Sequence, residues 1–105
     1  MQIADLALHP QLLRAAAEQG FVKATEVQEQ AIPAAVAGHD VIVCAKTGSG
    51  KTAAFLLPML HRLLASAAPD TSTRALILLP TRELALQTQK MFESILSKIN
   101  QKIFK

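Results

Sequence analysis

The amino-acid sequence predicts an α/β fold with a parallel sheet and flanking helices, on three observations. Two apolar runs, 41–44 and 74–79, have the β-branched and aliphatic composition of buried strands. A helical pattern lies between them, so the crossover of about thirty residues has the length of a βαβ unit. A glycine turn, Gly48-Ser49-Gly50, separates the first run from this helix. Such a unit places its strands in parallel with a right-handed connection.

Each expected helix is marked by local signals. Residues 10–19 carry Pro10 in the first turn, Gly20 after the end, and an apolar face of Leu12, Leu13 and Ala16. A second helical stretch begins after Thr25, and we expect Pro33 to interrupt it and Gly38 to end it.

Two longer helices follow, one after each predicted strand. The first is expected over about 51–64 with a kink at Pro58, and a surface loop at 67–73 follows it. The second is expected over about 81–99, with an apolar side formed by Leu84, Met91, Ile95 and Leu96.

Two strands make an incomplete sheet. A two-stranded parallel sheet cannot bury both of its faces and is marginal alone. We therefore expect that the sequence stops partway through a domain. The predicted division is a helical segment, 1–38, followed by the first half of a sheet domain, 39–105.

The composition indicates a folded chain rather than a disordered or membrane-embedded one. Half of the 105 residues are apolar and 18% are charged. The net charge of +3 comes from the last sixteen residues, so it does not indicate a basic nucleic-acid surface. The sequence lacks an export signal and an apolar run of membrane-spanning length, and Cys44 stands alone; we expect a cytoplasmic location without membrane contact.

The strongest chemical signal is the loop Ala45-Lys46-Thr47-Gly48-Ser49-Gly50-Lys51-Thr52. Its glycines let several backbone N–H groups face phosphate oxygens, and the next helix adds its positive N-terminal end. Lys51 is placed to reach the β- and γ-phosphates of ATP, and the Thr52 hydroxyl to bind Mg²⁺. The strict P-loop pattern asks for glycine where Ala45 stands. Lys46 is either a second phosphate ligand or a solvated side chain.

Three motifs together resemble those of the DEAD-box RNA helicases. Residues 45–52 match their motif I, Pro80-Thr81-Arg82-Glu83-Leu84-Ala85 matches their motif Ia, and residues 20–28 are similar to their adenine-recognising Q motif. The resemblance covers about 3–95. It implies a P-loop NTPase fold, a partial first RecA-like domain preceded by the helical Q-motif segment. It also implies ATP and Mg²⁺ as cofactors and RNA as partner.

The Q-motif resemblance assigns an adenine site to four residues. Gln28 would read the base, since an amide donates and accepts at once, Phe21 would stack on it, and Lys23 and Thr25 would line the same pocket. Other roles stay open, because Thr25-x-x-Gln28 is also a capping box and Phe21 also suits a core. Two positions depart from the family pattern: Ala24 replaces a proline, and Ile3 replaces an aromatic residue that would stack on adenine.

Motif Ia begins where the second predicted strand ends, at the edge of a sheet where ligands gather. By resemblance, residues 80–83 contact the RNA backbone without reading its sequence, chiefly through Thr81 and Arg82. Thr81 is alternatively a plain N-cap, with Glu83 favouring the helix dipole.

The acidic motif that ATP hydrolysis needs is absent from these residues. No Asp-Glu pair occurs among the eight acids, so no complete catalytic set is present, and Lys51 alone would stabilise transition-state charge. We expect ATP binding without multiple turnover from this chain, with the remainder of a helicase downstream. Three alternatives stay open: a short ATP- or RNA-binding module, a truncated gene product without function, and a P-loop kinase, which has no reason to carry 80–85. His9, His39 and His61 lack metal-ligand spacing with Cys44, which disfavours a zinc site.

Overall fold

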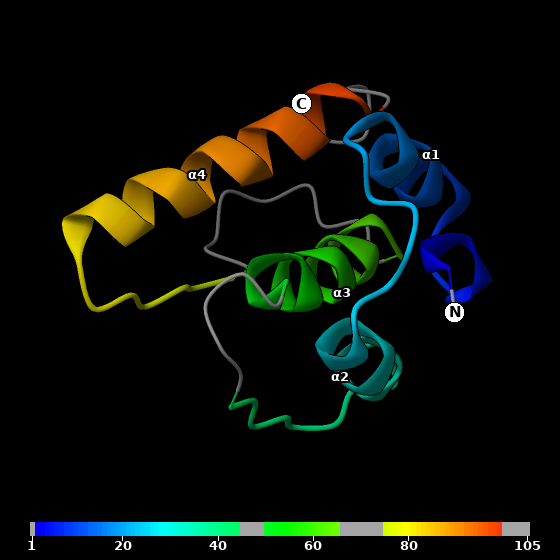
Figure 1. The fold of residues 1–105 in the computed structure, drawn as a ribbon, viewed down its shortest axis with the longest axis horizontal. Helices are drawn as coiled ribbons and strands as arrows, with labels where there is room; N and C mark the ends of the chain where they lie inside the picture. The colour runs from blue at the N-terminus through cyan, green and yellow to red at the C-terminus, as the bar shows by residue number, and fades with distance from the viewer. Residues whose placement is uncertain (1, 45–49, 66–74, 100–105) are drawn as a thin grey trace.

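The structure is a computed structural model that describes residues 2–44, 50–65 and 75–99. Within them the chain forms a 3-10 helix, η1 (Ile3–Asp5), and four α-helices: α1 (Pro10–Glu18), α2 (Glu26–Val36), α3 (Lys51–Ala65) and α4 (Arg82–Ser97). α3 packs against α2 and α1, and α1 also packs against η1 and α4 (Figure 1). None of the helices in the described ranges has both the length and the apolar character needed to cross a membrane.

The helix ends confirm the local signals in the sequence. Thr25 caps α2 and Thr81 caps α4, each with a side-chain oxygen that accepts a backbone N–H of the first turn. Gly20 and Gly38 lie just beyond α1 and α2 with φ of +96° and +92°, a conformation that favours glycine.

Pro33 does not interrupt the second helix, contrary to the prediction. α2 runs through Pro33 to Val36, because the capping box secures its start and its packing on α3 offsets the missing backbone donor. α3 is likewise continuous through Pro58, which is buried. The kink predicted at Pro58 stays a prediction.

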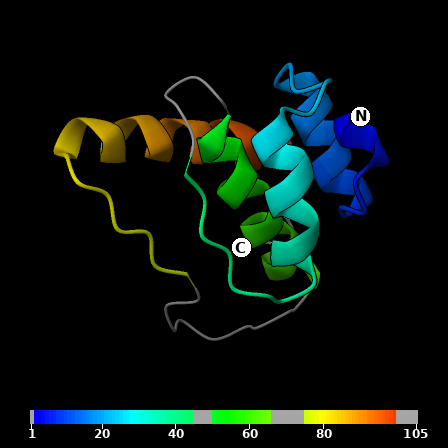
Figure 2. The same ribbon diagram turned by 60° about the horizontal axis from the view of Figure 1, so that its bottom comes forward.

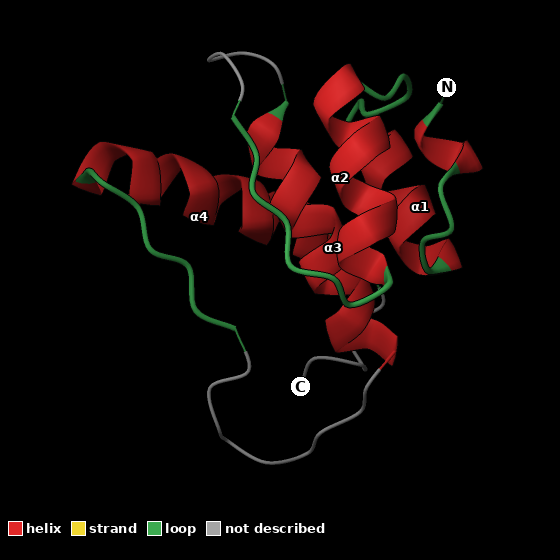
Figure 3. Cartoon of the chain, turned by 90° about the horizontal axis from the view of Figure 1, so that it is seen from below, coloured by secondary structure: helices red, strands yellow, loops and turns green. Residues whose placement is uncertain are grey.

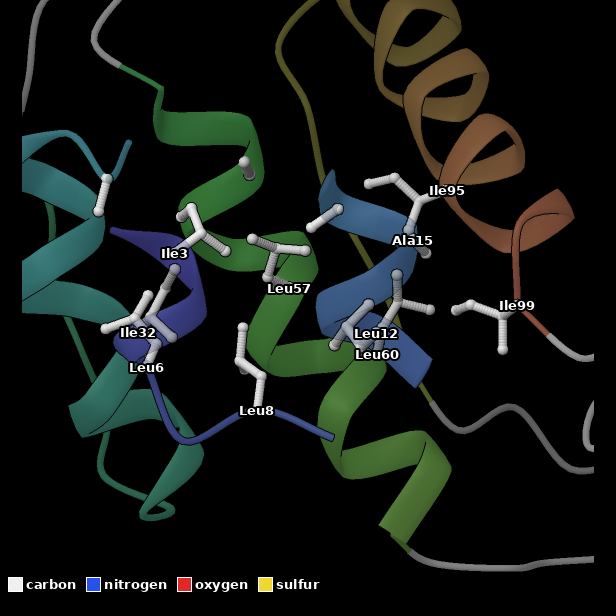
Figure 4. Packing of buried hydrophobic residues seen from close by; sticks show 13 residues of the cluster. Ile3, Leu6, Leu8, Leu12, Ala15, Ile32, Leu57, Leu60, Ile95 and Ile99 are labelled. Carbon is white, nitrogen blue, oxygen red and sulfur yellow. The ribbon is translucent and has the colours of Figure 1, made fainter. Parts of the chain in front are cut away.

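One hydrophobic core connects all the helices. Its fully buried members come from η1, α1, α2, α3 and α4: Ile3, Leu12, Ile32, Leu57, Leu60 and Ile95 (Figure 4). The core therefore contains residues from both of the predicted parts, 1–38 and 39–105. The division into these two parts stays a prediction.

The two predicted strands are not formed in the described residues. Val41–Cys44 and residues 75–79 lie outside any helix or sheet ladder, and the views place them on separate courses (Figures 2 and 3). They are also not buried: Ile42 is 96% exposed and Leu78 is 84% exposed. An apolar run becomes a buried strand only when neighbours satisfy its backbone and cover both of its faces. The described residues supply neither, so the parallel sheet is not confirmed.

Candidate functional site

A cleft of about 1410 Å³ opens between α2, α3, α4 and the two unpaired apolar segments. Its lining brings together five of the residues singled out in the sequence: Phe21, Gln28, Gly50, Lys51 and Thr52. The first two belong to the Q-motif segment and the last three to the end of the phosphate-loop motif. The fold therefore joins two motifs that are more than twenty residues apart in the sequence into one site.

Gln28 is the polar link between these two motifs. Its side chain is only 3% exposed, although it lines the cleft. The amide oxygen accepts the Thr25 backbone N–H at 3.0 Å, and the amide nitrogen donates to the Gly50 carbonyl at 3.2 Å. These two backbone partners fix which end of the amide is oxygen and which is nitrogen.

Gly50 immediately precedes α3 and is in close contact with the Q-motif segment. Its carbonyl accepts from Gln28 and, at 3.1 Å, from the backbone N–H of Ala54. Its φ is +85°, and a Cβ placed there would lie 2.5 Å from the Gln28 amide nitrogen and 3.1 Å from the Thr25 hydroxyl. A side chain at position 50 would thus displace Gln28, which explains the glycine by packing as well as by backbone angle.

Lys51 and Thr52 occupy the first turn of α3. Lys51 is exposed and Thr52 is half-buried, and both line the cleft. The first backbone N–H groups of an α-helix lack helical partners, so this end of α3 is suited to bind an anion. The other loop residues, Ala45, Lys46, Thr47, Gly48 and Ser49, lie outside the described residues.

The remaining Q-motif residues have different positions. Phe21 lines the cleft and also packs against the hydrophobic core, so both roles considered for it are compatible with its place. Thr25 lies beside Gly50 as the cap of α2, which confirms the capping box. Lys23 is exposed, pairs with Gln2 in an isolated antiparallel bridge, and is not among the lining residues.

Ile3, which replaces an aromatic residue of the family pattern, is 1% exposed in the core. Its backbone N–H bonds the Val22 carbonyl at 2.8 Å, and its side chain is not part of the cleft lining. Phe21 is therefore the aromatic side chain that the Q-motif segment offers to this cleft.

The candidate RNA-contacting residues form the start of α4, which projects beyond the other helices (Figures 1 and 2). Pro80, Thr81, Arg82 and Glu83 are exposed and outside the cleft lining, whereas their neighbours Leu79 and Leu84 line it. The Thr81 hydroxyl accepts the Leu84 backbone N–H at 3.1 Å, which confirms its role as N-cap. This segment is thus adjacent to the cleft but separate from it.

The sequence does not predict the contact of the Gly50 carbonyl or several further residues of the cleft lining. Gly50 is predicted as part of the phosphate loop, and a loop motif does not indicate which side chain a backbone carbonyl will accept a hydrogen bond from. The further lining residues include Ala31 and Ala35 of α2, Met59 of α3 and Met91 of α4. The four-residue spacing of the two alanines was a usable signal, because small residues at helical spacing allow close approach.

Comparison with known proteins identifies this arrangement. A family model described as "DEAD/DEAH box helicase" matches residues 25–104. The chain is 52% identical to the ATP-dependent RNA helicase dbp-9 of Neurospora crassa, over 90% of this chain and 14% of that protein. It is also 52% identical to the probable ATP-dependent RNA helicase ddx27 of Dictyostelium discoideum, over 87% of this chain and 12% of that protein.

Solved structures show the same fold. A DEAD box protein from the hyperthermophile Methanococcus jannaschii superposes with a TM-score of 0.82 at 36% identity, over 95% of this chain and 26% of that one. The RNA helicase Prp28 from Chaetomium thermophilum, bound to ADP, superposes with a TM-score of 0.81 at 36% identity. The match covers 92% of this chain and 25% of that one. The chain spans about one seventh of the length of the curated relatives, 14% of dbp-9 and 12% of ddx27. A match over most of its residues and a shared fold show that the chain belongs to the DEAD/DEAH box helicase family.

Proposed function

We propose that this chain is the ATP-binding portion of an RNA helicase and that it holds ATP with Mg²⁺ in the cleft between α2 and α3. The observation that carries the proposal is the hydrogen bond from Gln28 to Gly50, which joins the base-reading motif to the phosphate-binding end of α3. The relatives named ATP-dependent RNA helicases and the neighbour bound to ADP support it.

The Gln28 amide keeps the hydrogen-bonding capacity that adenine recognition needs. A side-chain amide has two N–H donors and two acceptor lone pairs, and the fold uses one donor and one acceptor. Among the described residues, one N–H and one lone pair of the amide remain without a partner. They match the adenine N7 acceptor and N6 donor, whereas guanine presents an acceptor, O6, in place of the N6 donor. Phe21 supplies an apolar ring in the same cleft.

The start of α3 supplies the phosphate and metal contacts in this proposal. Lys51 would hold the β- and γ-phosphates. The Thr52 hydroxyl is an oxygen ligand of the type that Mg²⁺ prefers. Both side chains lie in the first turn of a helix that lines the same cleft as Gln28, so the residues present fit a magnesium nucleotide. The bound ion would neutralise charge on the phosphates.

RNA unwinding or remodelling by the whole protein is part of the same proposal. The exposed Arg82 at the projecting start of α4 would contact an RNA phosphate, next to the nucleotide cleft. The chain described here contains no Asp-Glu pair that could position water for hydrolysis. We therefore expect it to bind ATP without multiple turnover, even with saturating RNA.

The proposal is tested by titrating the 105-residue chain with a fluorescent ATP analogue and Mg²⁺. Lys51→Ala is expected to weaken binding on the order of tenfold, equivalent to about 1.4 kcal/mol, because a charged phosphate contact is lost. Lys90→Ala is the matched control: it removes another exposed lysine, one that lies on α4 outside the cleft lining, and is expected to leave affinity unchanged.

Competition with unlabelled nucleotides tests the base. ATP should displace the analogue at far lower concentration than GTP. Equal competition by the two nucleotides, or equal weakening by Lys51→Ala and Lys90→Ala, would contradict the proposed site. Phosphate release that Lys51→Ala abolishes would contradict the absence of turnover.

A further inference from the structure

Two histidines, neither of which is in the cleft lining, connect the start of α1 to α3. The Nδ1 atom of His61, on α3, accepts the backbone N–H of His9 at 2.9 Å. His9 is the N-cap of α1, and its own Nδ1 accepts the backbone N–H of Gln11 at 3.1 Å. Both rings are half-buried, and neither is used by the ATP or RNA proposal.

Both hydrogen bonds require a neutral ring. An imidazole nitrogen accepts a hydrogen bond only while it carries a lone pair, and in the protonated ring both nitrogens are donors. Protonation of His61 would therefore turn its Nδ1 from an acceptor into a donor that faces the His9 N–H. Protonation of His9 would in the same way remove the cap of α1.

The surroundings of His61 favour its neutral form. Partial burial, and secondarily the charge of nearby His9, lower the pKa of His61 below its ordinary value. Other charged side chains occur on α3 and on the elements next to it: Asp5, Arg14, Glu18, Glu26, Glu29, Lys51 and Arg62. Among the residues that the structure describes, His9 is the charged group that shifts the pKa of His61, and none of the described carboxylates raises that pKa.

We propose that His61 is an acid-sensitive clasp that holds the start of α1 on α3 while its ring is neutral and releases it on protonation. The clasp bears on the nucleotide cleft through the chain that follows α1. The Phe21 backbone N–H bonds the carbonyl of Ala16, in α1, at 2.9 Å, so Phe21 is positioned by the helix that the clasp holds. Loss of the clasp therefore weakens the packing of α1 on α3 first. It then affects the position of Phe21, the aromatic side chain that lines the cleft.

The direction of the pH dependence follows from the lowered pKa. The unfolded chain binds a proton at His61 near its ordinary pKa, about 6.5, whereas the folded chain resists protonation until lower pH. The clasp thus contributes its full stability above about pH 6.5. That stability falls as the pH drops below this value toward the lower pKa of the folded state.

Two variants of His61 separate the clasp from other effects of acid. His61→Asn keeps an acceptor oxygen near the Nδ1 position and cannot be protonated in this range. At about pH 8 this variant is expected to keep most of the wild-type free energy of unfolding. Between about pH 6.5 and 5 its free energy of unfolding should decrease much less than that of the wild type. His61→Phe keeps a ring of similar size without an acceptor. It should be less stable at about pH 8, because the His9 N–H then lacks its partner.

The experiment combines urea unfolding with a proton NMR titration of the histidine ring protons in the 105-residue chain. The titration should show a pKa for His61 below the ordinary histidine value of about 6.5. In His9→Asn, which keeps the backbone donor and a capping side chain, the pKa of His61 should rise but stay below its ordinary value, because burial remains. The exposed His39→Gln is the control and should retain the wild-type pH dependence.

Three results would overturn the clasp. One is a His61 pKa at or above the ordinary histidine value of about 6.5. Another is a His61→Asn variant that loses stability in acid as steeply as the wild type does. The third is a His9→Asn variant in which the pKa of His61 does not move. The titration needs no variant of His61, so it decides the matter even if His61→Phe does not fold.

Discussion

At the residue scale, the amide of Gln28 has both a structural role and a proposed recognition role. It closes the capping box of α2 with its oxygen and reaches the start of α3 with its nitrogen. The sequence predicts both the capping role and the adenine-recognition role, but as alternatives. Residue spacing alone cannot show that a capping amide still has an N–H and a lone pair available for a second partner. In the structure, the contacts to Thr25 and Gly50 occupy one lone pair and one N–H of the amide, so among the described residues the other lone pair and N–H stay available for the proposed recognition role.

Gly50→Ala tests this contact. The new Cβ would meet the Gln28 amide nitrogen at 2.5 Å, and alanine would be strained at a φ of +85°. We expect a loss of about 2–4 kcal/mol in the free energy of unfolding, measured by urea denaturation. Gly38→Ala is the matched control: its φ is +92°, but nothing lies within 4 Å, so only the backbone strain of about 1–2 kcal/mol is expected. Equal losses in the two variants would show that the Gln28 contact contributes nothing.

At the element scale, the helices could be predicted from the sequence and the strands could not. A helix end depends on one or two nearby residues, such as Thr25, Thr81 or Gly20, so the signal and the structure lie in the same short stretch. A strand depends on partners far away in the chain. The apolar runs 41–44 and 75–79 have strand composition, yet without paired neighbours among the described residues they stay outside a sheet.

The start of α4 allows its capping role to be separated from its proposed RNA contact. Thr81→Ala removes the oxygen that accepts the Leu84 N–H and should cost about 1 kcal/mol in the free energy of unfolding. Thr81→Ser keeps that oxygen and should cost less. Arg82→Ala leaves the cap intact, so it should change stability by less than about 0.5 kcal/mol while weakening the binding of a single-stranded RNA. An Arg82→Ala variant with unchanged RNA affinity at low salt would argue against the RNA contact.

At the scale of the whole molecule, the helices share a packed core while one side of the structure stays apolar and open. The core connects η1 to α4 through residues such as Leu12, Leu57 and Ile95 (Figure 4). On the open side, Ile42, Leu76 and Leu78 are each more than three-quarters exposed. Exposed aliphatic side chains next to unpaired backbone favour association with other chains.

We therefore expect the 105-residue chain to self-associate as its concentration rises. The double variant Ile42→Lys with Leu78→Lys should shift the chain toward the monomer, as measured by sedimentation or by light scattering after size exclusion. Gln30→Lys together with Gln89→Lys is the control, since it adds the same charge at exposed polar positions. If the control suppresses association equally, the cause is net charge and not the apolar segments.

The bond between Gln28 and Gly50 has a consequence for how base preference could change. A protein that reads its base with a freely rotating side chain can exchange that side chain alone. Here the proposed base-reading residue, Gln28, also connects α2 to the start of α3, with its donor directed at position 50 and its acceptor at position 25. A switch from adenine to guanine would have to rebuild three positions together. A single substitution at position 28 would remove the contact to Gly50 and weaken the proposed phosphate-binding end of the site before any new base preference could emerge. The first step of such a change in evolution would therefore lower the affinity for nucleotide.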